Sequence, residues 1–482
     1  MEVPQRTPRP HSEFGDGISS GSSQEPCGGK RSPAGWIVFS VLLLALLGPA
    51  WGAELTDRKA NEELLTLDQA IGLAVESNRL VKNSTLDVDK AAAQVAATRT
   101  RRLPGFSFKA QANQLLTPIE FTFSQGAFGN FPATGPVPGH DTKLQTSPRL
   151  TGLLSATVSQ PLLEQFSIKK NIDLGALNMD VAAEQLRNQR QTVVANVKRT
   201  YFGIVQTRSA LESAEESITL YRELERTVKN QVRQQKALEA DHLDMQTRLA
   251  EAEYNALTLR HNMAAQKEQL NELLGRDVEA DFTVTPISAL AEPGGDPQVG
   301  VTRALRQRPD VRQARLQVQQ AEHDKTIKTL EYLPALDLTF NYVSLQNVGQ
   351  VLPNQIITAG VWLTWEPFDW GRKNQELAGK RQALAQARNG VLETEAQAQV
   401  DVNNRHRTLL QAQAFLPAKR LAKETAQEKL RIAKNRYTQK NVLLKDVLQA
   451  QSDLADANAQ YSQALSNVWS ARADFEKATG ED

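Results

Sequence analysis

The sequence predicts a mainly α-helical protein that contains a few β-strands and repeats one structural unit twice. Composition is the first reason: aromatic residues make up 6% and charged residues 23% of the chain, and Ala, Gln, Leu, Arg, Lys and Glu dominate its second half. Such a composition is typical of long packed helices. The second reason is a set of matching segments in the two halves. The third is the length of the stretches that almost no proline interrupts.

The matching segments define the repeat. Ala70–Val81 aligns with Gly300–Val311, and Leu243–Glu253 aligns with Leu448–Asn458. The first copy is longer between these segments, and its additional residues fall in a Gly-, Pro- and Phe-rich stretch that we expect to be a long loop. We therefore expect an N-terminal extension with a signal peptide over 1–53, a first repeat over 54–290 with the loop at 115–148, a connector over 291–299 and a second repeat over 300–482.

The N-terminal extension indicates the compartment. Lys30 and Arg31 precede the apolar run Trp36–Gly48, and small residues follow up to Ala53. This order is typical of a secretory signal, and we expect cleavage after Gly52. The run is too short for a membrane span, and no later hydrophobic helix is present in the sequence. An exported chain of this kind enters a membrane, if at all, through β-structure.

Catalytic and metal-binding signals are weak. The formal charge of +1 provides no electrostatic footprint for nucleic acid, and Cys27 is the only cysteine. We find no phosphate loop, dinucleotide fingerprint or zinc-protease motif. His242 lacks a histidine or carboxylate partner at metal spacing, so we interpret it as a structural histidine. We expect no catalytic residue, no metal and no cofactor, which disfavours an enzyme.

Each repeat is expected to begin with two helices and to end with a helical hairpin. Thr66 and Gln69 have the spacing of a capping box at the first helix. The long helices are expected from about Ile168 to Gln235 and from Gly371 to Lys440, where Pro417 predicts a kink. The return helices carry an apolar residue at alternating steps of three and four, which indicates a coiled-coil hairpin, and glycines at 275 and 480 end them.

Two strands separate the short and long helices of each repeat, over about 104–115 and 150–161 and over about 334–345 and 356–367. Apolar and polar residues alternate in them, as in Leu336–Tyr342. A tilted strand of about ten residues is long enough to cross a bilayer. A small antiparallel sheet packed on helices would give the same alternation. Four strands are too few to close a barrel, which needs about eight, so several chains would have to supply one membrane β-barrel.

The junction between the last strand and the last long helix concentrates aromatic residues. Trp362, Trp365 and Trp370 are half of the six tryptophans in the chain. Tryptophan prefers the interface between membrane and water. Pro367 suits a strand end or a first helical turn, and Gly371 permits a tight bend before the helix. We interpret this stretch as a membrane-interface junction.

Two segments resemble the TolC-like outer membrane efflux protein family. Trp365–Ala387 contains the family's Pro-Phe-Asp-x-Gly-Arg junction, and Asp446–Leu465 is similar to its return helix. The resemblance covers about Leu65–Gly480, although Ser159–Asn171 in the first copy lacks the Gly-Arg pair. It implies a homotrimer with a twelve-stranded barrel in outer membrane lipid and a periplasmic α-barrel tunnel. The expected function is the outer membrane channel of a tripartite efflux or secretion system, with a periplasmic adaptor (membrane fusion) protein and an inner-membrane pump as partners.

The resemblance also implies a periplasmic gate at the helical tips, formed by Asp446, Asp241 and Tyr437. Symmetry-related carboxylates around an axis would repel one another and attract cations. Lys440, Val442 and Gln449 depart from the family's best-known gate network, so the bonds that close this gate must differ. An aspartate favoured by the helix macrodipole at a helix start is the alternative interpretation of Asp446.

A second functional class competes with the channel. A soluble periplasmic coiled-coil scaffold or adaptor could use the same hairpins, with the strands as a small capping sheet. Adaptors of that type are expected to carry compact β-domains around one hairpin, whereas this sequence predicts two hairpins and duplicated strand pairs. The sequence therefore favours the channel.

Overall fold

The structure, a computed structural model, describes residues 63–114, 116–118, 120–145, 150–285, 296–346, 353–439 and 441–481. All of them belong to one compact unit, Ala60–Asp482. The expected signal peptide over 1–53, residues 291–295 of the expected connector, and Lys440 lie outside the described residues.

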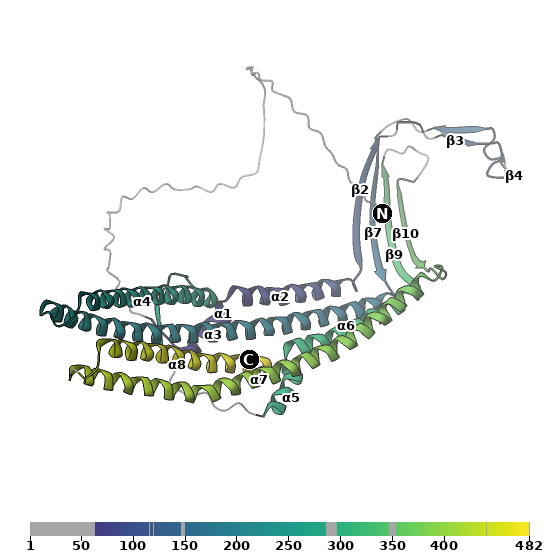
Figure 1. Ribbon diagram of the computed structural model, residues 1–482. Coiled ribbons are helices and arrows are strands. Elements are labelled where there is room, and N and C mark those ends of the chain that lie inside the picture. Colours follow the sequence, from purple (N-terminus) through teal and green to yellow (C-terminus); the bar gives the residue numbers. More distant parts are fainter. Residues whose placement is uncertain are drawn as a thin grey trace, which may run out of the picture. The chain divides into compact units, whose positions relative to one another are not determined.

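The helices follow the expected order in each half of the chain (Figure 1). The first half contains α1 (Leu67–Ser77), α2 (Arg79–Thr100), α3 (Gln165–Arg233) and α4 (Glu239–Leu274). The second half contains α5 (Pro297–Gln307), α6 (Pro309–Leu330), α7 (Arg372–Thr438) and α8 (Leu444–Thr479). The capping box at α1 is confirmed, since Gln69 N–H donates to Thr66 Oγ1 at 3.3 Å and Thr66 N–H donates to Gln69 Oε1 at 3.0 Å. Pro417 lies inside α7 without ending it.

A four-stranded antiparallel sheet combines strands from both halves. Its order is β10–β9–β7–β2, from β10 (Gln355–Thr364), β9 (Ala335–Gln346), β7 (Leu150–Pro161) and β2 (Gly105–Gln114). These strands overlap the four expected ranges, but β10 ends at Thr364, before Trp365 and Pro367. A separate parallel pair joins β1 (Glu63–Leu65) to β8 (Phe282–Val284). The two outer strands of the larger sheet, β10 and β2, each have one unpaired edge within the chain.

The stretch 115–148, where we expect a long loop, connects β2 to β7. Its described residues contain two short hairpins. One pairs β3 (Glu120–Phe123) with β6 (Thr142–Gln145), and the other pairs β4 (Asn130–Phe131) with β5 (Gly135–Pro136). Strands of two to four residues are too short to show an alternating pattern in the sequence. Glycines with positive φ at 126, 129 and 135 provide the turns.

The long helices pack in rows. At the level of the return helices the order is α4, α3, α8, α7, and towards the sheet it is α2, α3, α6, α7. The largest core cluster surrounds Tyr201 of α3, which is fully buried. Its hydroxyl donates to Leu65 O at 2.9 Å and accepts from the Thr285 N–H at 3.0 Å. Tyr201 therefore attaches the β1–β8 pair to the long helix through hydrogen bonds that are shielded from water.

Candidate gate and membrane junction

The two expected gate aspartates occupy the same position on their helices. Asp241 and Asp446 are the third residues of α4 and α8, and both are exposed. The Leu238 N–H donates to Asp241 Oδ2 at 3.1 Å, and the Leu443 N–H donates to Asp446 Oδ2 at 3.0 Å. Each carboxylate thus caps its helix and interacts favourably with the helix dipole. This local role matches the alternative interpretation, and it leaves each negative charge facing solvent at a hairpin tip.

Tyr437 lies near the end of α7 and packs, partly buried, against the apolar cluster around Met245 and Val447. Among the described residues, no hydrogen bond joins Tyr437 to Asp241 or Asp446. A single chain therefore places the three residues at the tips of the two hairpins, in the last turn of α7 and the first turns of α4 and α8, but does not connect them in one polar network.

His242 is held by two carboxylates, as expected of a structural histidine whose ring nitrogens are satisfied. Its Nε2 lies 2.8 Å from Glu225 Oε1 and its Nδ1 lies 3.2 Å from Glu239 Oε1. Both hydrogen bonds raise the pKa of His242, and the one with Glu225 has the larger effect. Glu225 is on α3, far away in the sequence, so only the i−3 residue Glu239 gave a sequence signal. The described residues contain no cluster of His, Cys, Asp or Glu suited to a metal ion.

The junction tryptophans are strongly exposed in the isolated chain. Trp362 lies within β10, Trp365 follows the strand, and Trp370 is 91% exposed. Trp370 has a φ of 57° and Gly371 a φ of 84°, so two consecutive residues adopt the left-handed conformation. This conformation is unfavourable for a residue with a side chain. It allows a tight bend between Pro367 and the start of α7, and Trp370 packs edge-to-face on Phe368 with ring centroids 4.9 Å apart.

A set of hydrogen bonds and ion pairs, which the sequence alone did not reveal, stabilises this bend. Asp369 accepts hydrogen bonds from Gly371 N–H at 3.1 Å and from Lys373 N–H at 2.9 Å, and the second bond lowers the pKa of the Asp369 carboxyl. Lys373 is buried, and its Nζ donates to the Glu366 carbonyl at 2.9 Å. Arg372 pairs with the Glu366 carboxylate at 2.7 Å. Asp369 of the junction motif therefore caps the first turn of α7, and Arg372 and Lys373 attach that turn to Glu366.

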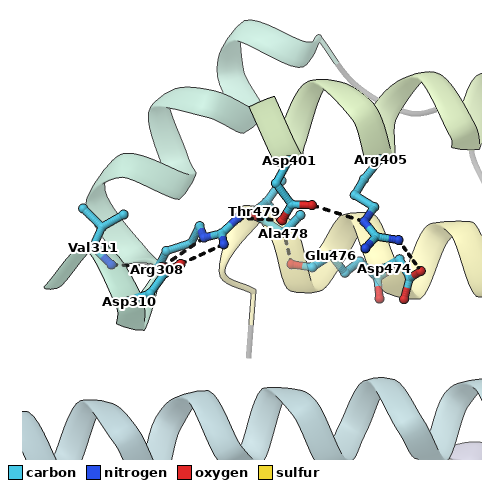
Figure 2. Close-up of polar contacts among 9 residues, drawn as sticks. All are labelled: Arg308, Asp310, Val311, Asp401, Arg405, Asp474, Glu476, Ala478 and Thr479. Atoms are coloured by element: carbon cyan, nitrogen blue, oxygen red, sulfur yellow. Dashed lines mark hydrogen bonds and ion pairs between the residues drawn. The ribbon is translucent and has the colours of Figure 1, made fainter. Parts of the chain in front are cut away.

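A second missed cluster joins the end of α8 to the turn between α5 and α6 (Figure 2). Arg308 donates to Asp310 Oδ2 at 2.8 Å, to Asp401 Oδ2 of α7 at 2.9 Å and to the Ala478 carbonyl at 3.2 Å. Arg405 extends the network from Asp401 to Asp474 of α8. Four elements of the second half, α5 to α8, thus meet at one guanidinium.

These features define a class of protein. Helices of 69 and 67 residues follow directly from antiparallel strands of ten to twelve residues, and paired helical tips carry exposed carboxylates. Among the described residues, no helix combines the length and apolar character needed to cross a membrane. The two long helical hairpins therefore continue towards a sheet that carries exposed tryptophans at one end.

The chain belongs to the outer membrane efflux protein family, whose sequence model matches residues 70–276 and 300–481. It is therefore an outer membrane channel with a periplasmic helical portion, and the scaffold or adaptor alternative is not supported. Among curated proteins, no sequence matches this chain.

Solved structures of outer membrane channels share the fold. The Campylobacter jejuni CmeC channel superposes with a TM-score of 0.70 at 17% identity, covering 86% of this chain and 85% of CmeC. The Vibrio cholerae outer membrane protein VceC gives 0.67 at 16% identity, over 86% of this chain and 96% of VceC. The open state of the Neisseria gonorrhoeae MtrE channel gives 0.67 at 16% identity, over 86% of this chain and 89% of MtrE.

Proposed function

We propose that three copies of the chain close into one passive duct, with a twelve-stranded barrel in the outer membrane and a tunnel of helices in the periplasm. The observation that carries this proposal is the pair of open edges. β10 and β2 end the sheet, and because every neighbouring pair is antiparallel, β10 of one copy can pair antiparallel with β2 of the next. Exposed edges of this length are otherwise aggregation sites.

The helices support the same closure. In both rows of helices, α7 is the last member on one side, while α4 or α2 is the last on the other. These outer helices expose large apolar residues, among them Tyr254 and Leu257 on α4 and Leu392, Val400 and Phe415 on α7. Apolar surface of this extent is expected to be covered by a partner. A head-to-tail ring of identical copies would cover both faces at once.

The register of the sheet supports a duplicated unit and predicts the contact between copies. Phe106 pairs with Val158 in the first hairpin, and the repeat-matched Leu336 pairs with Leu363 in the second. The repeat therefore preserves the pairing within each hairpin. Between the hairpins, Ala156 of β7 pairs with Tyr342 of β9. If the ring continues this pattern, the matched residues Ala112 of β2 and Val361 of β10 pair between neighbouring copies.

The contacts at the helix ends are also duplicated. Asn78 donates to Leu273 O at 2.8 Å, and the matched Arg308 donates to Ala478 O at 3.2 Å. Gly275 and Gly480 follow these carbonyls, each in the left-handed conformation. These pairs support the domain division into a first repeat over 54–290 and a second over 300–482.

The remaining roles follow from the ring. The tryptophans at 362, 365 and 370 would lie at the boundary of outer membrane lipid. The helical tips would meet a periplasmic adaptor and an inner-membrane pump, which supplies the energy for transport. Copies of Asp446 and Asp241 would surround the periplasmic entrance, with Tyr437 near them.

Fractionation tests the proposed function. The mature protein should sediment with the outer membrane, resist extraction without detergent, and run as a trimer on a denaturing gel until the sample is boiled. Release of the protein in soluble form by osmotic shock would contradict the duct.

Asp446→Asn tests the gate. The amide oxygen can still accept the Leu443 N–H, so the helix cap is kept while one negative charge per chain is removed. In planar bilayers we expect the cation-over-anion permeability ratio to fall by about threefold and block by multivalent cations to weaken. Asp453→Asn, two turns further along α8, is the control and should leave both properties unchanged. Equal behaviour of the two variants would remove Asp446 from the gate.

A further inference from the structure

We infer that a pocket between α3 and α8 binds a small aromatic molecule carrying one negative charge. This interhelical pocket is a cavity of about 230 Å³ lined by residues of α3, α7, α8 and β8. It is separate from the hairpin tips and from the membrane junction. Its walls come from both halves of the chain, since α3 belongs to the first half and α7 and α8 belong to the second.

One wall of the pocket is aromatic. Phe202 of α3 and Trp469 of α8 stack with ring centroids 5.4 Å apart and an interplanar angle of 25°. Tyr461, two turns before Trp469 on the same helix, adds a third ring, and Leu465 lies between them. Aromatic faces of this kind favour flat ring systems, which gain both burial and offset stacking.

Trp469 also carries a buried polar atom behind this aromatic wall. The indole Nε1–H of Trp469 is shielded from solvent and has no acceptor among the described residues. A buried donor without a partner is unfavourable, and indole can only donate.

The net charge of the side chains that line the pocket determines the sign of the charge that a ligand should carry. The positive charge of Arg208 is neutralised, because Arg208 pairs with Glu212 at 3.0 Å and also donates to Val284 O at 3.3 Å. Lys423 of α7 is different: its Nζ lies 5.2 Å from the Tyr461 ring centroid, and it joins none of the ion pairs among the described residues. The excess is one positive charge beside an aromatic wall, which favours a monoanion on a flat apolar body.

A ligand in this position would bridge the two halves. At the same level the α3–α8 contact is polar, with the hydroxyls of Ser209 and Ser462 3.1 Å apart. An aromatic ring bound between Phe202, Tyr461 and Lys423 would contact α3, α7 and α8 at once. Binding of the ligand should therefore hold α3 against α7 and α8.

The test uses the purified full-length channel exchanged into amphipol, with 1-anilinonaphthalene-8-sulfonate as the probe. We expect one saturable site per chain with energy transfer from tryptophan, and Trp469→Phe should remove most of that transfer although three other tryptophans remain in the mature chain. Lys423→Ala should weaken binding about tenfold, the loss of one charge-assisted contact. Lys419→Ala, one turn earlier on α7, is the matched control and should bind the probe like the wild type.

A variant that fills the pocket with a larger side chain tests the proposal without changing any charge. Ser462→Leu places a larger side chain in the pocket and should abolish saturable binding while the protein still runs as a heat-modifiable oligomer. Equal affinities for Lys423→Ala and Lys419→Ala, or undiminished transfer in Trp469→Phe, would overturn the proposal.

Discussion

Replacing Gly275 with alanine is expected to be among the most destabilising single substitutions in this chain. Gly275 ends α4 with a φ of 69°, and a Cβ added there would lie 2.3 Å from the Ser77 carbonyl oxygen and 2.7 Å from its carbon. Both atoms belong to the backbone at the junction of α1 and α2, so no side-chain rotation can relieve the overlap. The end of α4 would have to move away, which would also break the hydrogen bond from Asn78 to Leu273 O.

We expect this variant to lose on the order of 3 to 5 kcal/mol of stability. The measurement is the urea midpoint of the purified protein by far-ultraviolet circular dichroism, together with the yield of heat-modifiable oligomer. Gly371→Ala is the matched control, because Gly371 has a φ of 84° but nothing within 4 Å of the added Cβ. It should lose only about 1 kcal/mol from the left-handed conformation. Similar midpoints for the two variants would contradict the steric explanation.

The second large effect is expected at Arg308. Arg308→Met keeps much of the side-chain volume but removes the guanidinium that binds Asp310, Asp401 and Ala478 O. Removing one partner of a shielded network leaves the other groups without compensation. Because both carboxylates are more than one third exposed, water can partly replace the lost bonds. We therefore expect a loss of about 2 kcal/mol, below the range for fully buried pairs.

Loosening of the C-terminal end of α8 should accompany this loss. Limited proteolysis should cut the Arg308→Met chain near Ala478 faster than the wild type. Arg405→Met is the control, since Arg405 is 46% exposed and lies at the outer side of the same network. Its midpoint should shift by less than about 1 kcal/mol. An Arg308 variant as stable and as resistant as Arg405→Met would show that the cluster does not hold α8.

Much of the fold could be predicted because its signals are long or repeated. A proline-free stretch the length of α3 and a regular apolar seam in α8 each provide many residues of evidence for one element. The strands alternate over ten to twelve residues, and the same order of elements occurs twice in the sequence. The junction motif at residues 365–374 was recognisable because Trp, Pro and Gly each restrict the backbone or its environment in a distinct way.

The remainder depends on contacts between residues far apart in the sequence. Glu225 approaches His242 only because α3 and α4 form a hairpin, and Asp401 approaches Arg308 only because α7 packs beside α5. The interhelical pocket combines α3 with Lys423 and Trp469, and no spacing along the chain indicates this combination. Asp241 and Asp446 lie at the hairpin tips, but their capping bonds are local and give no information about neighbouring copies.

Disulfide cross-linking can show whether β10 of one copy pairs with β2 of the next. Cys27 is the only natural cysteine, so in a Cys27→Ala background the pair Ala112→Cys and Val361→Cys is free of competing thiols. Residues paired across antiparallel strands are close enough for a disulfide. Mild oxidation of cells should therefore give a covalent trimer that persists on a non-reducing denaturing gel after the sample is boiled.

Ala112→Cys with Gly360→Cys is the register control, because adjacent residues of a strand point to opposite faces. It should remain monomeric after oxidation and denaturation, as should each single-cysteine variant. We expect covalent trimer from the Ala112–Val361 pair alone. Chains that stay monomeric with that pair, or that cross-link equally well with the control pair, would rule out the proposed ring.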